Sequence, residues 1–401
     1  MDLRLLSLSF CASAAGLAEA ILTGILPSVA SDLDVSLSLA GQLTSIFSLS
    51  FAVAAPLLGR LTCGADSRRL LVITLLVFAA FNAGAALSPG FVTLLLMRVG
   101  MATCCGLLVT QAGLLAVDLA SAARRGRAIG LIFTGISGAL VLGVPAGVLV
   151  DAWFGWRWVF AGIALYALPL AALLRVALPP RVLDGRADGA AYLRHLRDPA
   201  LNLAQLVSIL LLGGHFTLFA YLTPWFRQAA GITDSRRIAL TLLLIGLAAV
   251  GGGYLGGRLS DRLGPRRALV IVPLLFAASM LAIPLSLGHP WLLLAALMIW
   301  STISWMISPT VQSYLLAGDP ADGGVGVALN TSAMHLGVVL GAATGGAVIS
   351  LVGIARAPWA GLALVALSVV SAALSCRLRR KRDGAPLTRP GSPAPRRAGR
   401  P

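Results

Sequence analysis

The chain has 401 residues, of which 58% are hydrophobic and only 11% are charged. This composition excludes an ordinary soluble globular protein, because apolar runs of about 20 residues, each long enough to cross a bilayer as a helix, recur along the chain. The formal net charge of +16 does not indicate nucleic-acid binding, since the arginines gather in alternate loops and in the tail, which is the pattern of a membrane topology.

The first apolar run, from about 5 to 29, contains Glu19, the only glutamate in the chain. A carboxylate at mid-membrane depth is costly and is usually retained for function. At helical spacing, one face of the run is small or polar, and it consists of Ala12, Gly16, Glu19, Thr23 and Pro27. Three other interpretations remain open. They are a secretory signal cleaved at Ala18-Glu19-Ala20, a lipid-facing or purely structural glutamate, and a carboxyl held neutral in a packed interface.

Hydropathy predicts an all-α membrane protein with twelve transmembrane helices. The predicted spans are 5–29, 39–58, 70–88, 91–115, 128–150, 158–177, 201–222, 238–257, 268–287, 291–314, 325–349 and 358–376. We expect two six-helix bundles, 1–177 and 201–376, joined by a polar cytoplasmic linker over 178–200. The tail, 377–401, is basic and rich in proline and glycine, and we expect it to be disordered.

The loops alternate in charge from one side of the membrane to the other. About 25 of the 31 basic residues lie on the side of both termini, which by the positive-inside rule is the cytoplasm. The basic cluster that opens the tail, Arg377 to Arg382, is expected to rest on anionic lipid head groups rather than on nucleic acid.

Arg98, in the fourth span, is the second charge expected inside the membrane. At about 1.5 Å per residue, it lies roughly 10 Å from the outer end of its span, and Glu19 lies roughly 12 Å from the outer end of the first span. The two charges therefore share a depth, and pairing between them would reduce the cost of burying each.

The fifth span is rich in glycine, which allows close helix contact, and its proline bends the helix. Its motif comprises Gly138, Gly143, Pro145 and Gly147, followed by an exit of sequence Gly155-Trp156-Arg157. Glycines also serve ordinary packing in membrane helices, so the combination of the motif with its exit is the informative feature.

The two halves repeat each other around a glycine-bounded basic loop. The first copy contains Gly59, Arg60, Asp66, Arg68 and Arg69, and the second contains Gly257, Asp261, Arg262, Gly264, Arg266 and Arg267. A repeat in the same orientation is typical of a two-bundle transporter, although a duplicated scaffold shows it too. We expect these loops to latch one conformation, because glycine permits a tight turn and an acidic residue can pair with the arginines or a helix N-terminus. The alternative is a solvated positive-inside loop.

Polar side chains inside the spans are candidates for the lining of a central cavity. They are Thr23, Asn82, Gln111, His215, Tyr221, Gln312, Asn330 and His335. For each one, a helix-to-helix hydrogen bond is the competing interpretation. No metal site, cofactor or disulfide framework is expected, because the five cysteines and four histidines lack paired or clustered spacings.

The basic loops resemble the signature loop of the major facilitator superfamily, Arg98 matches the arginine of its fourth-span motif, and the fifth span resembles the motif of its drug:proton antiporter branch. Further segments resemble its bacterial chloramphenicol, sugar and nucleoside efflux subgroup, and they are Ala18-Glu19, Gly24 to Pro27, Ala40 to Ser45, Gly213 to Phe216, Tyr221 to Pro224 and Ala328 to Gly337. The resemblance covers nearly all of 5–376. Departures from the pattern are Cys63 for an aspartate and Gly64 for an arginine in the first loop, Ala20 for a phenylalanine, and His335 for an asparagine.

The resemblance implies a transporter, not an enzyme, in the bacterial cytoplasmic membrane. It implies proton-driven export of a small amphipathic molecule, with a phenicol-like drug as the leading candidate. We hypothesise that Glu19 binds the coupling proton and that Arg98 tunes its affinity or takes part in its transfer, the alternative for Arg98 being a fixed ion pair in helix packing. Export of a sugar, nucleoside or metabolite stays open, as does a non-transporting receptor or scaffold. The expected partners are the substrate, protons and lipids, with the protein acting as a monomer.

Overall fold

The computed structural model describes residues 3–62, 64–120, 125–182, 189–318 and 323–383, which are almost entirely helical. Within these ranges, twelve helices are long and apolar enough to cross a membrane, so the predicted all-α class is confirmed. The spans of the N-terminal half are α1 (Leu3–Asp32), α2 (Leu37–Leu61), α3 (Ser67–Ala86), α4 (Phe91–Leu119), a fifth span made of α5 (Arg125–Gly138), η2 (Ala139–Gly143) and α6 (Val144–Phe154), and α7 (Trp156–Ala177).

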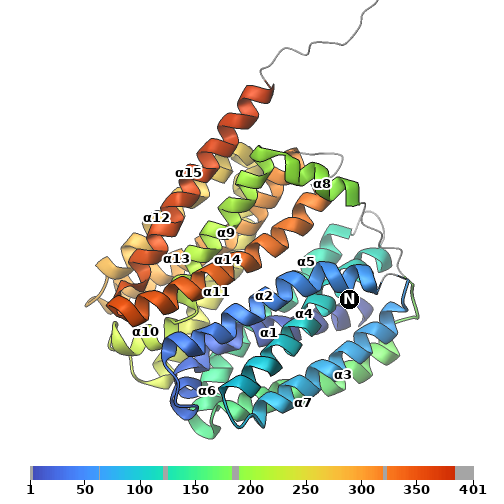
Figure 1. Ribbon diagram of the computed structural model, residues 1–401, viewed down its shortest axis with the longest axis vertical. Coiled ribbons are helices and arrows are strands. Elements are labelled where there is room, and N and C mark those ends of the chain that lie inside the picture. Colours follow the sequence, from blue (N-terminus) through green and yellow to red (C-terminus); the bar gives the residue numbers. More distant parts are fainter. Residues whose placement is uncertain (1–2, 63, 121–124, 183–188, 319–322, 384–401) are drawn as a thin grey trace, which may run out of the picture.

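The C-terminal half follows the short linker helix α8 (Gly189–Arg197). Its elements are α9 (Pro199–Phe219), α10 (Leu222–Gln228), α11 (Ser235–Leu263), α12 (Pro265–Leu285), α13 (Pro290–Gly318), α14 (Gly323–Val352), η3 (Ile354–Arg356) and α15 (Ala357–Asp383). Because the spans alternate in direction, the start of α1, the end of α15 and the helix α8 lie at one end of the molecule. We call this the terminal end, and we call the opposite end, which carries the α1–α2 turn, α6 and α10, the far end (Figure 1).

Sequence-local chemistry sets where the helices begin and turn. Asp66, Asp198 and Asp234 cap α3, α9 and α11 by accepting hydrogen bonds from backbone N–H groups of the first turn. Gly155 joins α6 to α7 and Gly264 joins α11 to α12, at φ of +89° and +83°. A residue with a side chain is strained at such a φ, so glycine suits both corners.

Each half has its own hydrophobic core. One core is built from α1 to α7 alone, and the other fills the C-terminal half. The second core also takes in side chains of the first half, namely Ala20, Leu26, Ala30, Ala40, Val144 and Val148. These six come from α1, α2 and α6, mostly toward the far end, so the halves are fused by apolar packing there.

The contacts between the halves follow the same pattern. Helix α2 packs along α14, α6 and η2 pack against α11, and α1 touches α10, whereas α5 approaches α11 only marginally. In Figure 1 the halves accordingly converge at the end of α6 and α10 and separate toward the end of α5 and α8. The structure is therefore closed at the far end.

Three local features differ from the sequence-based expectations. The linker expected over 178–200 is not simply polar chain, because it holds α8 and the first turn of α9. Helix α15 continues to Asp383, so the boundary of the disordered tail at 377 is wrong, and 384–401 lie outside the described residues. The bend expected in the fifth span is a π-helical turn, η2, just before Pro145.

Candidate functional site

The intramembrane carboxylate lies at the seam between the two halves. Glu19 on α1 faces His335 on α14, with Oε1 and Nδ1 3.6 Å apart. Their side chains are 28% and 11% exposed, respectively. The imidazole stacks on Phe51 of α2, with ring centroids 3.9 Å apart and planes at 27°. Two titratable groups from opposite halves therefore meet at this point.

Arg98 lies beside this pair and is fully buried. Its Nη1 donates to the carbonyl of Ala18 at 2.6 Å, and its Nε donates to the carbonyl of Leu43 at 3.4 Å. Its guanidinium also sits 4.1 Å from the ring centroid of Phe47, a cation–π contact. Arg98 thus touches the backbone next to Glu19, but among the described residues the basic group within 4 Å of the Glu19 carboxylate is the imidazole of His335.

One stripe of α2 connects the arginine to the histidine. Leu43, Phe47 and Phe51 are four residues apart, so they share a face of the helix. Leu43 and Phe47 hold Arg98, and Phe51 holds His335. The resulting arrangement is a fixed, desolvated cation next to a partly exposed carboxylate and an imidazole, which suits the binding and release of a proton. Phe47 and Phe51 are not among the site residues predicted from the sequence, although their four-residue spacing places them on one helical face.

The glycine motif of the fifth span receives α1. Gly143 packs against Leu17 and Gly147 packs against Ile21, the residues two before and two after Glu19. An added Cβ at either glycine would overlap the end of that side chain, which would have to move, so the motif allows α1 to pack closely on both sides of Glu19. Pro145 is the second residue of α6, just after the π-helical turn, whereas an added Cβ at Gly138 would meet nothing within 4 Å.

The exit of this motif closes the far end of the N-terminal half. Trp156 Nε1 donates to Oδ2 of Asp32 at 3.1 Å, and Arg157 forms an ion pair with the same oxygen. Arg157 also lies over the Trp156 ring and donates to the carbonyl of Ser88. The exit therefore ties α7 to the end of α1 and to the α3–α4 turn.

Three of the other cavity candidates hold helices together in this structure. The side chains of the candidates are buried, with Gln312 half-buried. Gln111 bonds to Ser67, Asn330 to Gln205 and Ser208, Tyr221 to the carbonyl of Ala342, Asn82 to the carbonyl of Phe78, and Gln312 to Ser308. Thr23 is buried on α1. For Gln111, Asn330 and Tyr221, the competing interpretation of a helix-to-helix bond describes the contact.

His215 lies within an aromatic cluster of the C-terminal half. Its ring stacks on Trp300 and Phe219, with centroids 4.4 and 4.9 Å away, and contacts Phe216 and Phe276 at 5.2 and 6.1 Å. His215 is buried, as is Trp300. Among the described residues, the ring contacts of His215 all lie within its own half, whereas His335 stacks on Phe51 of the other half.

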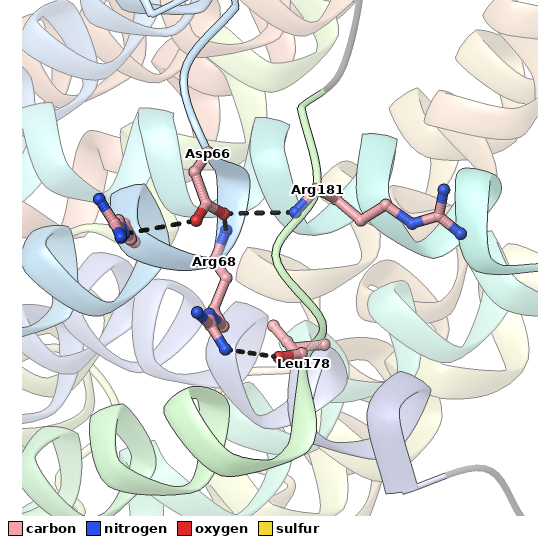
Figure 2. A network of polar contacts seen from close by, with 5 residues as sticks. Asp66, Arg68, Leu178 and Arg181 are labelled. Carbon is pink, nitrogen blue, oxygen red and sulfur yellow. Dashed lines mark hydrogen bonds and ion pairs between the residues drawn. The ribbon is translucent and has the colours of Figure 1, made fainter.

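Asp66 of the first basic loop anchors the chain that follows α7 (Figure 2). It caps α3 through the Arg68 N–H, pairs with Arg69 at 3.6 Å, and accepts from the backbone N–H of Arg181 at 3.3 Å. Ser67 N–H donates to the Arg181 carbonyl, and the Arg68 guanidinium reaches the Leu178 carbonyl. These contacts tie the start of α3 to the chain directly after α7 and do not reach the C-terminal bundle. Gly59 and Arg60 belong to the end of α2, while Cys63 lies outside the described residues.

The second basic loop is built differently. Gly264 makes the α11–α12 corner. Asp261 and Arg262 are exposed in the last turn of α11, and Gly257 lies about one turn earlier in the same helix. Arg266 and Arg267 line a cleft of about 340 Å³ with Tyr314 and Arg379 at the terminal end.

We expect Asp66→Ala to lower the free energy of unfolding by about 1–2 kcal/mol, because it removes a helix cap together with the backbone contact to Arg181. Asp66→Asn is the matched control, since an amide oxygen still caps the helix. The ion pair that asparagine loses contributes little, because the Arg69 side chain is 79% exposed. Unfolding midpoints of the purified variants in detergent measure the difference. Equal loss in both variants would contradict the assigned cap.

The linker helix docks on the C-terminal half through His195, which is buried. Its imidazole bonds to the Gln205 amide at 3.1 Å, and Gln205 also contacts the Gly326 carbonyl and Asn330. This network joins α8, α9 and α14. This docking was not predicted from the sequence, because the composition of 178–200 indicates only a polar linker.

Comparison with known proteins agrees with this architecture. The family model described as Major Facilitator Superfamily matches residues 8–323. The chain is 33% identical over 354 residues to a chloramphenicol resistance protein of Streptomyces lividans, covering 85% of this chain and 87% of the relative. It is 30% identical to the uncharacterized MFS-type transporter YbcL of Bacillus subtilis, with 90% and 92% covered.

Solved structures share the fold at low sequence identity. A bacterial homologue of the human lysosomal transporter Spinster, in an inward-facing and unoccupied conformation, matches with a TM-score of 0.81 at 16% identity, covering 94% of this chain and 97% of that one. A D-xylose-proton symporter matches with a TM-score of 0.75 at 17% identity, covering 92% and 96%. With its twelve spans, its two bundles and a family match over most of its length, the chain belongs to the Major Facilitator Superfamily of membrane transporters.

Proposed function

We propose that the protein exports a small amphipathic compound, with a phenicol-like drug as the leading candidate, in exchange for protons across the bacterial cytoplasmic membrane. The observation that carries this proposal is the partly exposed Glu19 at the seam of the two halves, between Arg98 and His335. The substrate class is supported by the similarity to the chloramphenicol resistance protein of Streptomyces lividans.

The far end is closed and the halves are separated at the terminal end, and this arrangement is the starting state of the transport cycle that we propose. The positive-inside rule puts the terminal end in the cytoplasm, so a structure closed at the far end receives substrate from the cytoplasmic side. Rocking of the halves about the seam then exposes the site to the outside. Binding energies shift the balance between these two conformations only insofar as substrate and proton bind them unequally.

Glu19 carries the exchange in this scheme. A proton entering from the outside neutralises the Glu19 carboxylate. Burying the neutral carboxyl in the apolar seam during the conformational change costs less free energy than burying the charged carboxylate. In the state open to the cytoplasm the proton leaves, and the carboxylate stays near the fixed charge of Arg98. Substrate leaves in the opposite direction, so the downhill proton drives its export.

Expression in a chloramphenicol-sensitive bacterium tests this function. We expect the wild-type protein to raise the inhibitory concentration of chloramphenicol and to lower its accumulation in cells. Addition of a proton uncoupler should abolish the effect, and Glu19→Gln should abolish it at equal membrane abundance. Unchanged resistance in Glu19→Gln would contradict the proposed proton site. Efflux of a sugar or a nucleoside without efflux of chloramphenicol would contradict the proposed drug substrate and assign the protein to export of that compound instead.

A further inference from the structure

We propose that His335 is a second proton-binding group of the transport site, so that the coupling proton is shared between the Glu19 carboxylate and this imidazole across the seam. This inference rests on the proposed function and deepens it. The imidazole thereby decides over which pH range the exchange proceeds, and it belongs to the half of the molecule that does not carry Glu19.

The first support is the geometry of the contact. At 3.6 Å, Nδ1 of His335 and Oε1 of Glu19 are slightly beyond hydrogen-bond distance, so a small movement of either half makes or breaks the bond. The ring cannot turn away freely, because it is stacked on Phe51 at 3.9 Å. His335 is buried, and the Glu19 carboxylate is its acidic neighbour within 4 Å among the described residues.

The second support is the set of charges around the pair. From α4, Arg98 and the thiol of Cys105 interact electrostatically with Glu19. From α2, the side chains at the pair are the aromatic Phe47 and Phe51, which do not titrate. His215 of α9 is occupied by its own aromatic cluster. Among these neighbours, His335 is therefore the one on the opposite half whose side chain can take up a proton beside Glu19.

The consequence follows from the location of the two groups on different halves. A single proton on the pair lies on either group. When it lies on the imidazole, a carboxylate faces an imidazolium, and the attraction joins α1 to α14. With two protons the carboxyl is neutral, and with none the imidazole is neutral, so in both cases the attraction is lost. The number of bound protons therefore biases the equilibrium between the state closed at the far end and the state open there. The three protonation states of the pair differ only in bound protons, and no other bond forms or breaks between them.

Selective carbon-13 labelling of glutamate tests the proposal without any substrate. Because Glu19 is the only glutamate in the chain, the labelled side-chain carboxyl carbon gives one protein signal in nuclear magnetic resonance of the purified, full-length protein. Two interacting groups titrate in two macroscopic steps, and we expect the wild-type signal to shift in two steps. In His335→Asn and in His335→Gln, we expect a single step.

Matched controls separate the pair from its surroundings. His215→Asn makes the same change at the other buried intramembrane histidine, and Cys105→Ser removes the other titratable neighbour, so both should keep two steps. The wild-type rate of chloramphenicol efflux, plotted against pH, should show one pH-dependent change for each of the two titrating groups. One of these two changes should disappear in His335→Asn, and both should remain in His215→Asn.

A single step in the wild-type titration would overturn the proposal, as would two steps in both His335 variants. The proposed function fails by a different observation. If wild-type cells show no uncoupler-sensitive efflux, the exporter assignment is wrong, whereas the titration of Glu19 needs neither efflux nor substrate.

Discussion

Replacing Arg98 with methionine is expected to leave the protein folded and to lower proton-driven export at least tenfold. The guanidinium is fully buried and is held by two backbone carbonyls and one aromatic ring. Methionine replaces most of its volume, and the Glu19 carboxylate is 28% exposed, so the substitution does not leave an uncompensated, fully buried charge. The carboxylate of Glu19 loses its fixed counter-charge, and a tenfold effect corresponds to only about 1.4 kcal/mol.

Arg98→Lys is the matched variant. Lysine keeps the charge but lacks the planar fork that reaches the carbonyls of Ala18 on α1 and Leu43 on α2 together. We expect export between that of the wild type and that of Arg98→Met. Thermal unfolding in detergent and efflux in cells give the two readouts. Wild-type export by Arg98→Met would show that Arg98 is a packing residue, the alternative that the sequence left open.

Gly41→Ala is expected to open the far end. Gly41 on α2 lies directly against the ring of Tyr221, whose hydroxyl donates to the Ala342 carbonyl of α14 at 2.8 Å. A methyl group at Gly41 would overlap that hydroxyl and ring. Because Tyr221 is fully buried and also packs on Gly345, relief requires the halves to separate there. We expect substrate efflux to fall several-fold as the conformational balance shifts away from the far-end-closed state.

Gly251→Ala in α11 is the control, because an added Cβ at that glycine meets nothing within 4 Å. Labelling of Ser38→Cys by a membrane-impermeant thiol reagent, in a background without native cysteines, reports opening, since Ser38 faces Gly346 at the seam. Labelling should be several-fold faster with Gly41→Ala than with Gly251→Ala. Equal rates would show that Tyr221 yields without separation of the halves.

The sequence predicted the spans well because hydropathy and helix length are local properties. All twelve expected spans correspond to helices, with ends displaced by a few residues. The displaced ends have physical causes. The Asp66 and Asp234 caps start α3 and α11 earlier than the apolar run does, and the charged turn after Cys376 continues as helix where hydropathy ends. Polarity marks the edge of the apolar layer rather than the end of a helix.

The site was predicted only in part. Depth along the membrane can be counted from the sequence, and the contact between Arg98 and the Ala18 carbonyl puts Arg98 level with the region of Glu19. The direction in which a side chain points around the bundle depends on which helices are neighbours, which local sequence does not contain. Glu19 therefore faces His335, from the opposite half, rather than forming the expected ion pair with Arg98. The docking of α8 through His195 escaped prediction for the same reason.

Proton movement in proteoliposomes tests the central claim most directly. Purified protein is reconstituted with a pH-sensitive dye inside the vesicles, and chloramphenicol is added on one side without an imposed pH gradient. Proton exchange predicts that wild-type protein moves protons opposite to the drug, that the dye signal saturates with drug concentration, and that Glu19→Gln gives no proton signal at equal protein content. Drug transport with undiminished proton counterflow in Glu19→Gln would contradict the assignment of Glu19 as the proton site.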